Sequence, residues 1–294
     1  MFGLLNLCKP AGVTSRDVVN RVQRLVKPHK VGHAGTLDPL ASGVLVVCLG
    51  PATRLIEYVQ RMPKRYLATF LLGRHSDTED VEGIVVELPN PPIPTEQQVR
   101  AILPQFLGRI QQQPPAFSAL KVDGKRAYDL ARQGEVPDLK PRPIEVHSVE
   151  LIEYAYPQMS LDVRCGSGTY VRSLGRDIAR ALGTEAVMSA LTRTEIGPFH
   201  VSQTLRGDDI TPQSIDRAFI PPLMALGSMP TFAVSEQEEA FLRNGRQIER
   251  RDFGSVNIGQ EGQEEIVLLT SAGRLLAIAV PTGPGFWQPR IVFG

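Results

Sequence analysis

The sequence predicts a protein of mixed α and β structure in two domains, and three observations lead to this prediction. At 294 residues the chain is longer than a typical single domain, so one large domain with a small appendage is expected. Helix-like and strand-like hydrophobic patterns are both present. After Pro221, Pro222 and Pro230 the pattern changes to a short helix and strands, which indicates a small β-rich domain at about 230–294.

The first elements surround a loop that is rich in small residues. Residues 2–8 are predicted to form a short strand, and Thr14 or Ser15 can cap the helix that follows. That helix has an apolar face formed by Val18, Val22, Leu25 and Val26. Its outer face carries Arg16, Arg21, Arg24 and Lys27. The stretch 31–43 is loop-like and leads into the apolar run 44–49, which is predicted to be a buried strand.

The middle of the chain combines strands, a helix and a basic stretch. Strands are predicted at 64–72 and 83–88, followed by a helix at about 95–106 that Pro104 should bend or shorten. Residues 108–142 have little apolar periodicity and carry many basic residues together with aromatic ones, which is typical of a projecting segment that grips RNA.

The later elements are a strand, a helix and the C-terminal pattern. Residues 159–165 alternate as a strand and 166–168 form a tight turn. Residues 170–182 are predicted to form a helix that Gly183 ends. In the C-terminal part, a short helix is predicted around 236–243, with strands near 264–269 and 274–280.

Composition excludes several classes of protein without naming a function. The net charge is +1, from 32 Lys and Arg against 31 Asp and Glu, so a surface for nucleic acid must be local. No run of 18 apolar residues is present, and Lys9 and Pro10 interrupt the opening apolar run, so we expect neither a membrane span nor a signal peptide. The cysteines are widely spaced and predict neither a disulfide framework nor a zinc site; they are Cys8, Cys48 and Cys165. These features favour a reducing, cytoplasmic setting.

The loop 32–43 contains a single acid, Asp38, among small residues. Pro39 biases Asp38 away from the helical region, and Gly35 and Gly43 allow a close approach of the backbone to a ligand. An ionised aspartate can act as a nucleophile without an activating base. Capping of a turn is an equally good interpretation of Asp38 from the residues alone.

Other chemistries find little support. His33 can be a base, a stacking ring or a turn histidine, and no nearby Ser or Cys supports a triad. No histidines are paired at HxH or HxxxH spacing with acidic companions, so no metal is expected. No Walker or dinucleotide-binding glycine motif is present, so no nucleotide cofactor is expected either.

The loop resembles the signature of the TruB pseudouridine synthases, through Gly32-His33, Gly35-Thr36-Leu37-Asp38-Pro39 and Gly43. Further motifs match in the same order along the chain. They are Lys9-Pro10 with Gly12, Thr14 and Ser15; Lys64-Arg65-Tyr66; Asp77-Thr78 with Asp80 and Gly83; Gln113-Pro114-Pro115 through Ser118-Ala119-Leu120-Lys121; Gly124-Lys125-Arg126-Ala127-Tyr128; and Gly168-Thr169-Tyr170-Val171-Arg172. The resemblance fades after about 230, where the family carries a PUA-like domain.

This resemblance implies a function and a fold. The expected activity is isomerisation of the uridine at position 55 in the T arm of tRNA to pseudouridine, by base flipping and without metal, cofactor or guide RNA. The expected fold is α+β, with a catalytic core around a largely antiparallel mixed sheet in residues 1–229 and a small PUA-like RNA-binding domain in 230–294. The protein is expected to act as a monomer in the cytoplasm.

The resemblance also assigns roles to residues. Asp38 would be the nucleophile, attacking C1′ or C6 or promoting a glycal, and Arg172 would pair with it. His33 would fill the space left by the flipped base and Tyr66 would pack against that base. The other residues implied to contact substrate are Tyr170, Lys9 and Lys121, and the stretch 121–142 would be a thumb that closes over the T-loop.

Several alternatives remain open from the residues. Tyr66 can be an ordinary core aromatic, and Arg172 a helix-face cation like Arg176 and Arg180. The sequence also departs from the family pattern at His75-Ser76, Gly166-Ser167 and Leu191-Thr192-Arg193. The rival functions are a non-catalytic tRNA-binding or tRNA-folding protein, a guide-RNA-dependent relative and a hydrolase with an aspartate nucleophile.

Overall fold

The computed structural model describes residues 1–118, 120–122, 125–127, 130, 139–227, 229–249, 265–282 and 285–294. Within these residues the strands form one large sheet, one smaller sheet and two short hairpins. The strands of the large sheet are β1 (Gly3–Lys9), β2 (Val31–His33), β3 (Ser42–Leu49), β4 (Lys64–Leu72), β7 (Gly108–Gln112), β10 (Arg142–Ala155), β11 (Gln158–Cys165), β12 (Ala186–Ile196), β13 (Phe199–His200) and β14 (Leu205–Arg206).

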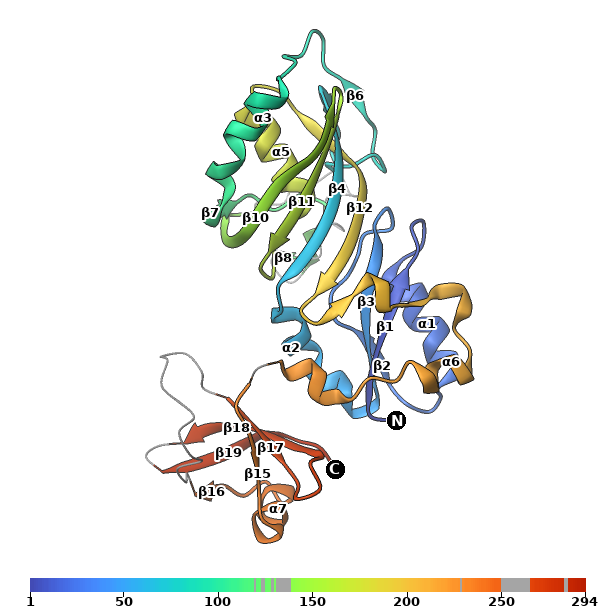
Figure 1. Ribbon diagram of the computed structural model, residues 1–294, viewed down its shortest axis with the longest axis vertical. Coiled ribbons are helices and arrows are strands. Elements are labelled where there is room, and N and C mark those ends of the chain that lie inside the picture. Colours follow the sequence, from blue (N-terminus) through green and yellow to red (C-terminus); the bar gives the residue numbers. More distant parts are fainter. Residues whose placement is uncertain are drawn as a thin grey trace.

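The large sheet is mixed and mostly antiparallel, as expected from the sequence. Its order is β14-β1-β3-β12-β4-β11-β10-β7, with β2 on β3 and β13 on β12. The parallel pairs are β1 with β14 and β3 with β12. The pair β3–β12 is short, joining Ser42 to Thr192 and Gly43 to Arg193. This seam joins the two halves of the sheet, which are visible in the upper and middle parts of Figure 1.

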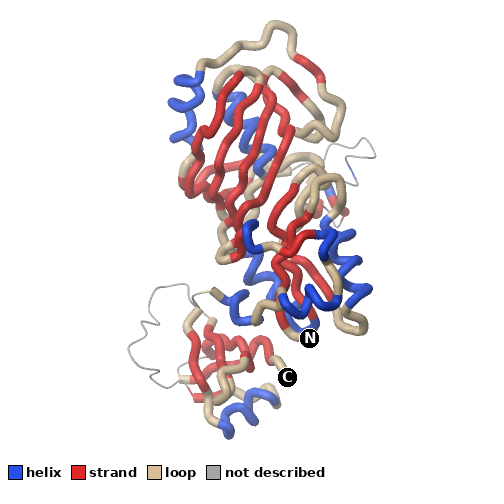
Figure 2. The backbone as a smooth tube through the Cα atoms, turned by 45° about the vertical axis from the view of Figure 1, so that its right-hand side comes forward, coloured by secondary structure: helices blue, strands red, loops and turns tan. Residues whose placement is uncertain are grey.

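The helices lie on the flanks of the strands in Figure 2. They are α1 (Ser15–Leu25), α2 (Ile56–Arg61), α3 (Glu96–Ile102), α5 (Val171–Ala181), α6 (Pro212–Arg217) and α7 (Glu236–Arg243). Short 3₁₀ helices are η1 (Gly50–Leu55), η2 (Leu103–Phe106), η3 (Val201–Gln203), η4 (Gly207–Asp209) and η5 (Pro222–Leu226).

Helix α1 begins and packs as its sequence predicts. The Thr14 hydroxyl accepts from the amide of Asp17 at 3.2 Å, and the Asp17 carboxylate accepts from the amide of Thr14 at 2.9 Å, which completes a capping box. Val18 and Val22 are buried in a cluster with Leu5 of β1. This packing fixes α1 against the strands that lead into the loop of Asp38.

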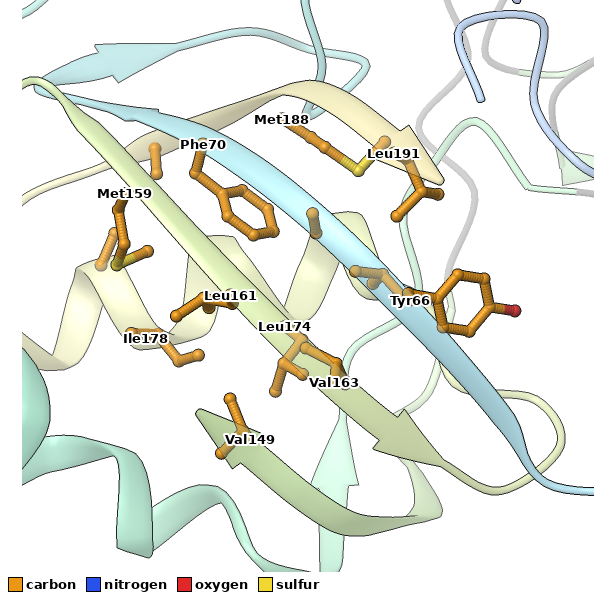
Figure 3. Close-up of a cluster of buried hydrophobic side chains, with 14 of the residues drawn as sticks. Tyr66, Phe70, Val149, Met159, Leu161, Val163, Leu174, Ile178, Met188 and Leu191 are labelled. Carbon is orange, nitrogen blue, oxygen red and sulfur yellow. The ribbon is translucent and has the colours of Figure 1, made fainter. Parts of the chain in front are cut away.

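Helix α5 packs against the other half of the sheet. Leu174 and Ile178 lie with Phe70 and Leu161 in one buried cluster, between the strands and the helix in Figure 3. A Cβ at Gly175 would overlap with the ring of Phe70, so a residue without a side chain is required at this crossing. The prediction of a helix at 170–182 is confirmed.

Two predicted elements need comment. The strand predicted at 83–88 is wrong except for β6 (Val86–Glu87), which pairs only with β5 (Arg74–His75). Ile84 is 81% exposed, so the apolar run there has no sheet to cover it. The helix predicted at 95–106 does end early, because α3 gives way to η2, where Pro104 lies.

The C-terminal part contains a second, five-stranded sheet. Its strands are β15 (Thr231–Ala233), β16 (Ile248–Glu249), β17 (Ile266–Leu269), β18 (Leu275–Thr282) and β19 (Phe286–Val292). This sheet lies beside α2 at the lower end of the molecule in Figure 1. Phe293 stacks on Phe2 with ring centroids 5.0 Å apart, and the Tyr58 hydroxyl donates to Glu265 at 3.2 Å. The β-rich C-terminal part predicted from the sequence is therefore present.

No helix in the described part of the chain is long and apolar enough to cross a membrane.

Candidate active site

The loop that carries Asp38 lies between β2 and β3, and hydrogen bonds fix it on both sides of the acid. The amide of Leu37 donates to the Ser15 hydroxyl at 2.9 Å, and that hydroxyl donates to the Leu37 carbonyl oxygen at 3.1 Å. The carbonyl oxygen of Pro39 accepts from Lys9 Nζ at 3.2 Å. The neighbours of Asp38 are thereby tied to α1 and to β1, which positions its carboxylate.

Lys9 differs from its expected role as a substrate-binding residue. Its side chain is fully buried, and Nζ donates to the carbonyl oxygens of Pro10 at 2.9 Å, Val13 at 2.7 Å and Pro39 at 3.2 Å. An ammonium has three protons, so these bonds use every donor. Burial lowers the pKa of Lys9, against the nearby charges of Glu82 and Asp38. The geometry makes Lys9 an anchor of the loop that contains Asp38, not a contact for substrate.

Arg172 and Asp38 form an ion pair, with Nε 3.0 Å from Oδ2. The Arg172 side chain is 7% exposed, whereas that of Asp38 is 37% exposed and accessible to a ligand. The same guanidinium donates to the carbonyl oxygens of Thr78 at 2.6 Å and Phe117 at 3.1 Å. It also lies 3.3 Å from the carboxylate of Asp80, which is buried. Arg172 is therefore a buried partner of Asp38 and not a cation on an exposed helix face.

The turn 76–83 also holds Arg172, through Asp80 and the carbonyl oxygen of Thr78. Asp80 accepts from the Thr78 hydroxyl at 2.6 Å and from the amide of Glu82 at 3.1 Å. Glu79 has a φ of 62° and accepts from the Ser173 hydroxyl at 2.6 Å. Its carboxylate also pairs with Arg176, which is buried. Burial raises the pKa of Glu79, and Arg176 and Ser173 act against that rise.

A cavity of about 940 Å³ opens at Asp38. Its wall includes Asp38, Arg172, Tyr66, Tyr170 and Lys64. Burial raises the pKa of Tyr66, which keeps its hydroxyl neutral. Figure 3 shows Tyr66 at one end of the buried cluster, with the hydroxyl pointing away from the other labelled side chains. Tyr66 thus belongs to the edge of the core and to the cavity at once.

The rim of the cavity near α5 combines an aromatic ring and a cation. Tyr170 is fixed by Gln112, whose side chain accepts from the Tyr170 amide at 2.9 Å and donates to its carbonyl oxygen at 3.0 Å. The guanidinium of Arg142 lies 5.1 Å from the centre of the Tyr170 ring and donates to the Gly168 carbonyl oxygen at 2.5 Å. Arg142 therefore places a positive charge beside Ser167, one of the positions where the sequence departs from the family pattern.

His33 lies at the end of β2, opposite Val47 of β3, and it is half-buried. Burial lowers its pKa, and the charges of Arg16 and Arg193 lower it further. A neutral ring is therefore favoured at pH 7. In the part of the chain that the structure describes, the residues that line the cavity do not include His33, although the loop that follows it does line the cavity.

Arg193 is a site residue that the sequence did not reveal. It is 2% exposed, and its guanidinium donates to the carbonyl oxygens of Val44 at 2.8 Å and Gly35 at 3.0 Å. Gly43, with a φ of 101°, lies so close to the Arg193 backbone that a Cβ would overlap with its carbonyl oxygen. Gly43 therefore allows two chain segments to meet, not a ligand to approach. The sequence signal that could have revealed Arg193 is a positively charged residue inside a strand-like stretch.

The last expected site elements fall largely outside the described residues. The backbone of β8 (Lys121–Val122) pairs with β9 (Lys125–Arg126), but the Lys121 side chain lies outside the described structure, as do most residues of the stretch 121–142. Among the described residues, no group of three or more His, Cys, Asp or Glu side chains is arranged to hold a metal ion.

Comparison with known proteins identifies the family. The model of the TruB family pseudouridylate synthase N-terminal domain matches residues 23–171. The chain belongs to this family. A tRNA pseudouridine synthase B of Rhodopseudomonas palustris is 40% identical over 100% of this chain and 81% of its own length. One of Dehalococcoides mccartyi is 38% identical, covering 100% of this chain and 97% of its own length.

Solved structures agree on the fold. A chain of a Cbf5-Nop10-Gar1 complex superimposes with a TM-score of 0.75 at 25% identity, covering 100% of this chain and 85% of that chain. A chain of an archaeal box H/ACA sRNP Nop10-Cbf5 complex gives a TM-score of 0.70 at 27% identity, covering 96% and 79% respectively. The TruB-family catalytic core and the β-rich C-terminal part are therefore a shared architecture.

Proposed function

We propose that the protein isomerises uridine 55 in the T arm of tRNA to pseudouridine, with Asp38 as the nucleophile. The observation that carries this proposal is the ion pair of Asp38 with Arg172 on the wall of the 940 Å³ cavity. The guanidinium of Arg172 fixes the orientation of the Asp38 carboxylate toward the cavity.

The reaction exchanges the bond from C1′ to N1 of uracil for a bond from C1′ to C5. The same base leaves and rejoins, so no further reactant is needed. The uridine must leave its stack to enter the cavity, which costs a few kcal/mol. In this proposal Tyr66 packs against the flipped base, Tyr170 walls the pocket, and His33 fills the space that the base leaves in the loop.

The choice of tRNA as the substrate rests on the relatives. Those with 38–40% identity over the whole chain carry the name tRNA pseudouridine synthase B, whereas the chains from the H/ACA complexes are only 25–27% identical. We therefore propose that the protein acts on tRNA without a guide RNA and as a monomer. We propose that the protein acts in the cytoplasm, where this substrate would be found.

The two parts of the chain would have different roles. Residues 1–229 would form the catalytic domain, with the stretch 121–142 and Lys121 gripping the T-loop. Residues 230–294 would form a small RNA-binding domain. Phosphate contacts of this kind make binding strongly dependent on salt.

The test is tritium release from a tRNA transcript labelled at C5 of uridine, using purified protein without guide RNA. Wild type should release tritium, and the new pseudouridine should map to the T-loop by primer extension. Asp38→Asn should bind the transcript as wild type does and release nothing. Asp216→Asn, at an exposed position on α6, serves as the matched control and should behave as wild type.

A tRNA-folding protein without catalysis predicts a different result. Wild type and Asp38→Asn would then both bind tRNA tightly, and neither would release tritium. Release by both proteins would instead show that Asp38 is not the nucleophile.

A further inference from the structure

Lys64 is a buried cation in the cavity wall that the proposed mechanism does not use. It begins β4, is 7% exposed, and lines the same cavity as Asp38. Its ammonium donates to the main-chain carbonyl oxygen of Gln60. No carboxylate in the described part of the chain forms an ion pair with Lys64. One neutral acceptor leaves two of its three N–H donors available.

A second cation lies on the same side of the cavity. Arg193 also lines the wall, is 2% exposed, and donates to the main-chain carbonyl oxygens of Val44 and Gly35, with the Tyr66 side chain as a further partner. Burial lowers the pKa of Lys64 to about 8, and the charge of Arg193 adds to this effect. The other groups that face Lys64 are the thiol of Cys165, whose pKa burial raises to about 11, and the ring of Tyr66 on the same strand. A buried ammonium is unfavourable when it has no anionic partner. A ligand that brings negative charge to this part of the wall would supply that partner.

The position of Lys64 identifies which part of the ligand reaches it. Lys64 and Tyr66 are two residues apart on β4 and are both buried, so they share one face of the strand. A base that packs against the Tyr66 ring therefore lies beside the Lys64 ammonium. In this arrangement the phosphates of the RNA would contact the rim, where Arg142 and Ser167 line the cavity, and not the buried part of the wall at Lys64.

We propose that the Lys64 ammonium binds a carbonyl oxygen of the flipped uracil and stabilises the base as an anion while it is detached from the sugar. This role rests on the proposed function. When the N1–C1′ bond breaks, a carboxylate oxygen of Asp38 bonds to C1′, and the electron pair of the broken bond stays with uracil, where its charge spreads over N1 and the two carbonyl oxygens. After the base turns, C5 supplies an electron pair to C1′ and displaces the Asp38 carboxylate; the proton on C5 then passes to solvent, and N1 takes a proton from solvent. Lys64 forms no covalent bond and neither gains nor loses a proton during these steps.

The test compares Lys64→Met, Lys64→Arg and the exposed-site control Lys27→Met in single-turnover tritium release, RNA binding and thermal unfolding. Removing one donor to a developing oxyanion costs about 10²–10³-fold in rate. Lys64→Met should lose this factor while its Kd for RNA stays within about twofold of wild type. Lys64→Arg keeps the charge and should recover much of the rate.

The pH profile separates this role from a purely structural one. The ammonium is protonated below its pKa and neutral above it, so the wild-type rate should fall as the pH rises through about 8. Arginine stays charged over this range, so the rate of Lys64→Arg should remain level. A fall that persists in Lys64→Arg would belong to another group and would overturn the proposal.

Other results would also overturn the proposal. An unchanged rate in Lys64→Met would show that Lys64 does not touch the reacting base. A weakened Kd with a shallower salt dependence and a normal single-turnover rate would make Lys64 a phosphate contact. A rate loss that Lys64→Arg does not restore, together with a lower Tm in both variants, would make it structural. Absence of tritium release from wild type would instead refute the proposed function itself.

Discussion

The buried ammonium of Lys9 donates to the carbonyl oxygen of Pro39 at 3.2 Å, and so ties β1 to the residue that follows Asp38. Lys9→Met would leave the carbonyl oxygens of Pro10 and Val13 without this donor, whereas the Pro39 oxygen would keep the amide of Gly12 at 2.8 Å. A buried acceptor that loses its partner costs about 1–3 kcal/mol, so we expect the free energy of unfolding to fall by about 3 kcal/mol. Urea denaturation measures this change, and Lys30→Met, at an exposed position, should alter it by less than about 0.5 kcal/mol. Equal denaturation midpoints for wild type and Lys9→Met would refute the anchoring role.

Arg172→Lys tests whether the geometry of the guanidinium matters beyond its charge. Lysine keeps the positive charge but cannot reach Asp38, Asp80 and the carbonyl oxygen of Thr78 at the same time. A misplaced carboxylate should slow single-turnover tritium release by about 100-fold, with little change in RNA affinity. Arg180→Lys is the matched control, because Arg180 lies on the same helix and pairs at the surface with Glu185 at 3.0 Å. A rate equal to wild type in Arg172→Lys would show that charge alone suffices.

Gly43→Ala tests the contact between the loop of Asp38 and β12. The new Cβ would overlap with the carbonyl oxygen of Arg193, and a φ of 101° is unfavourable for alanine. The free energy of unfolding should fall by about 3 kcal/mol, from backbone strain and overpacking together. Gly183→Ala has a φ of 79° but open space around the new Cβ, so only about 1 kcal/mol is expected there. Thermal unfolding of the two variants separates the cost of backbone strain from the cost of overpacking. Equal losses of stability in both would show that overlap with the Arg193 carbonyl oxygen contributes nothing.

Glu265→Gln tests how the C-terminal sheet is held. Glu265 accepts from the Tyr58 hydroxyl at 3.2 Å and pairs with Arg61 at 3.4 Å and with Arg290. Loss of its charge should weaken this contact by about 1 kcal/mol, which is about fivefold in an opening equilibrium. Amide hydrogen exchange should then accelerate in α2 and β19 but not in β4. Glu96→Gln removes an isolated surface pair with Arg100 and should leave exchange in α2 unchanged; acceleration there too would mean that the effect is not specific to Glu265.

Local signals in the sequence were sufficient for many elements. The apolar face at Val18 and Val22 predicted α1, and the strand predicted at 64–72 is β4. Long-range pairing was not readable, because the period of a strand does not name its neighbours. The apolar run at 83–88 shows the limit, since it has strand-like composition but meets only Arg74 and His75.

The residues of the candidate site likewise include some that the sequence could predict and some that it could not. The motif around Asp38 indicated the acid, and the family resemblance indicated Arg172 as its partner. Periodicity alone favoured an exposed cation at Arg172, because it cannot show that the turn 76–83 covers that face of α5. Lys9 and Arg193 were misjudged or missed for a related reason. Both side chains are held by main-chain carbonyl oxygens, which a side-chain pattern does not show; those that bind Arg193, and Pro39 for Lys9, also come from segments far away along the chain.

The short pairing of β3 with β12 has a mechanical consequence. Asp38 is carried by the half of the sheet that contains β3, whereas Arg172 is carried by the helix packed on the half that contains β4. Besides the two backbone pairs, the hydroxyls of Ser42 and Thr192 lie 3.0 Å apart across this edge, and the Arg193 guanidinium donates to the carbonyl oxygens of Val44 and Gly35. A shear of one half past the other would pull the acid from its arginine and would also disturb the buried cluster in which Leu37 and Ala41 lie with Tyr66. The ion pair of Asp38 with Arg172 thus depends on how firmly this seam holds, and changes at the seam should alter the geometry of the pair.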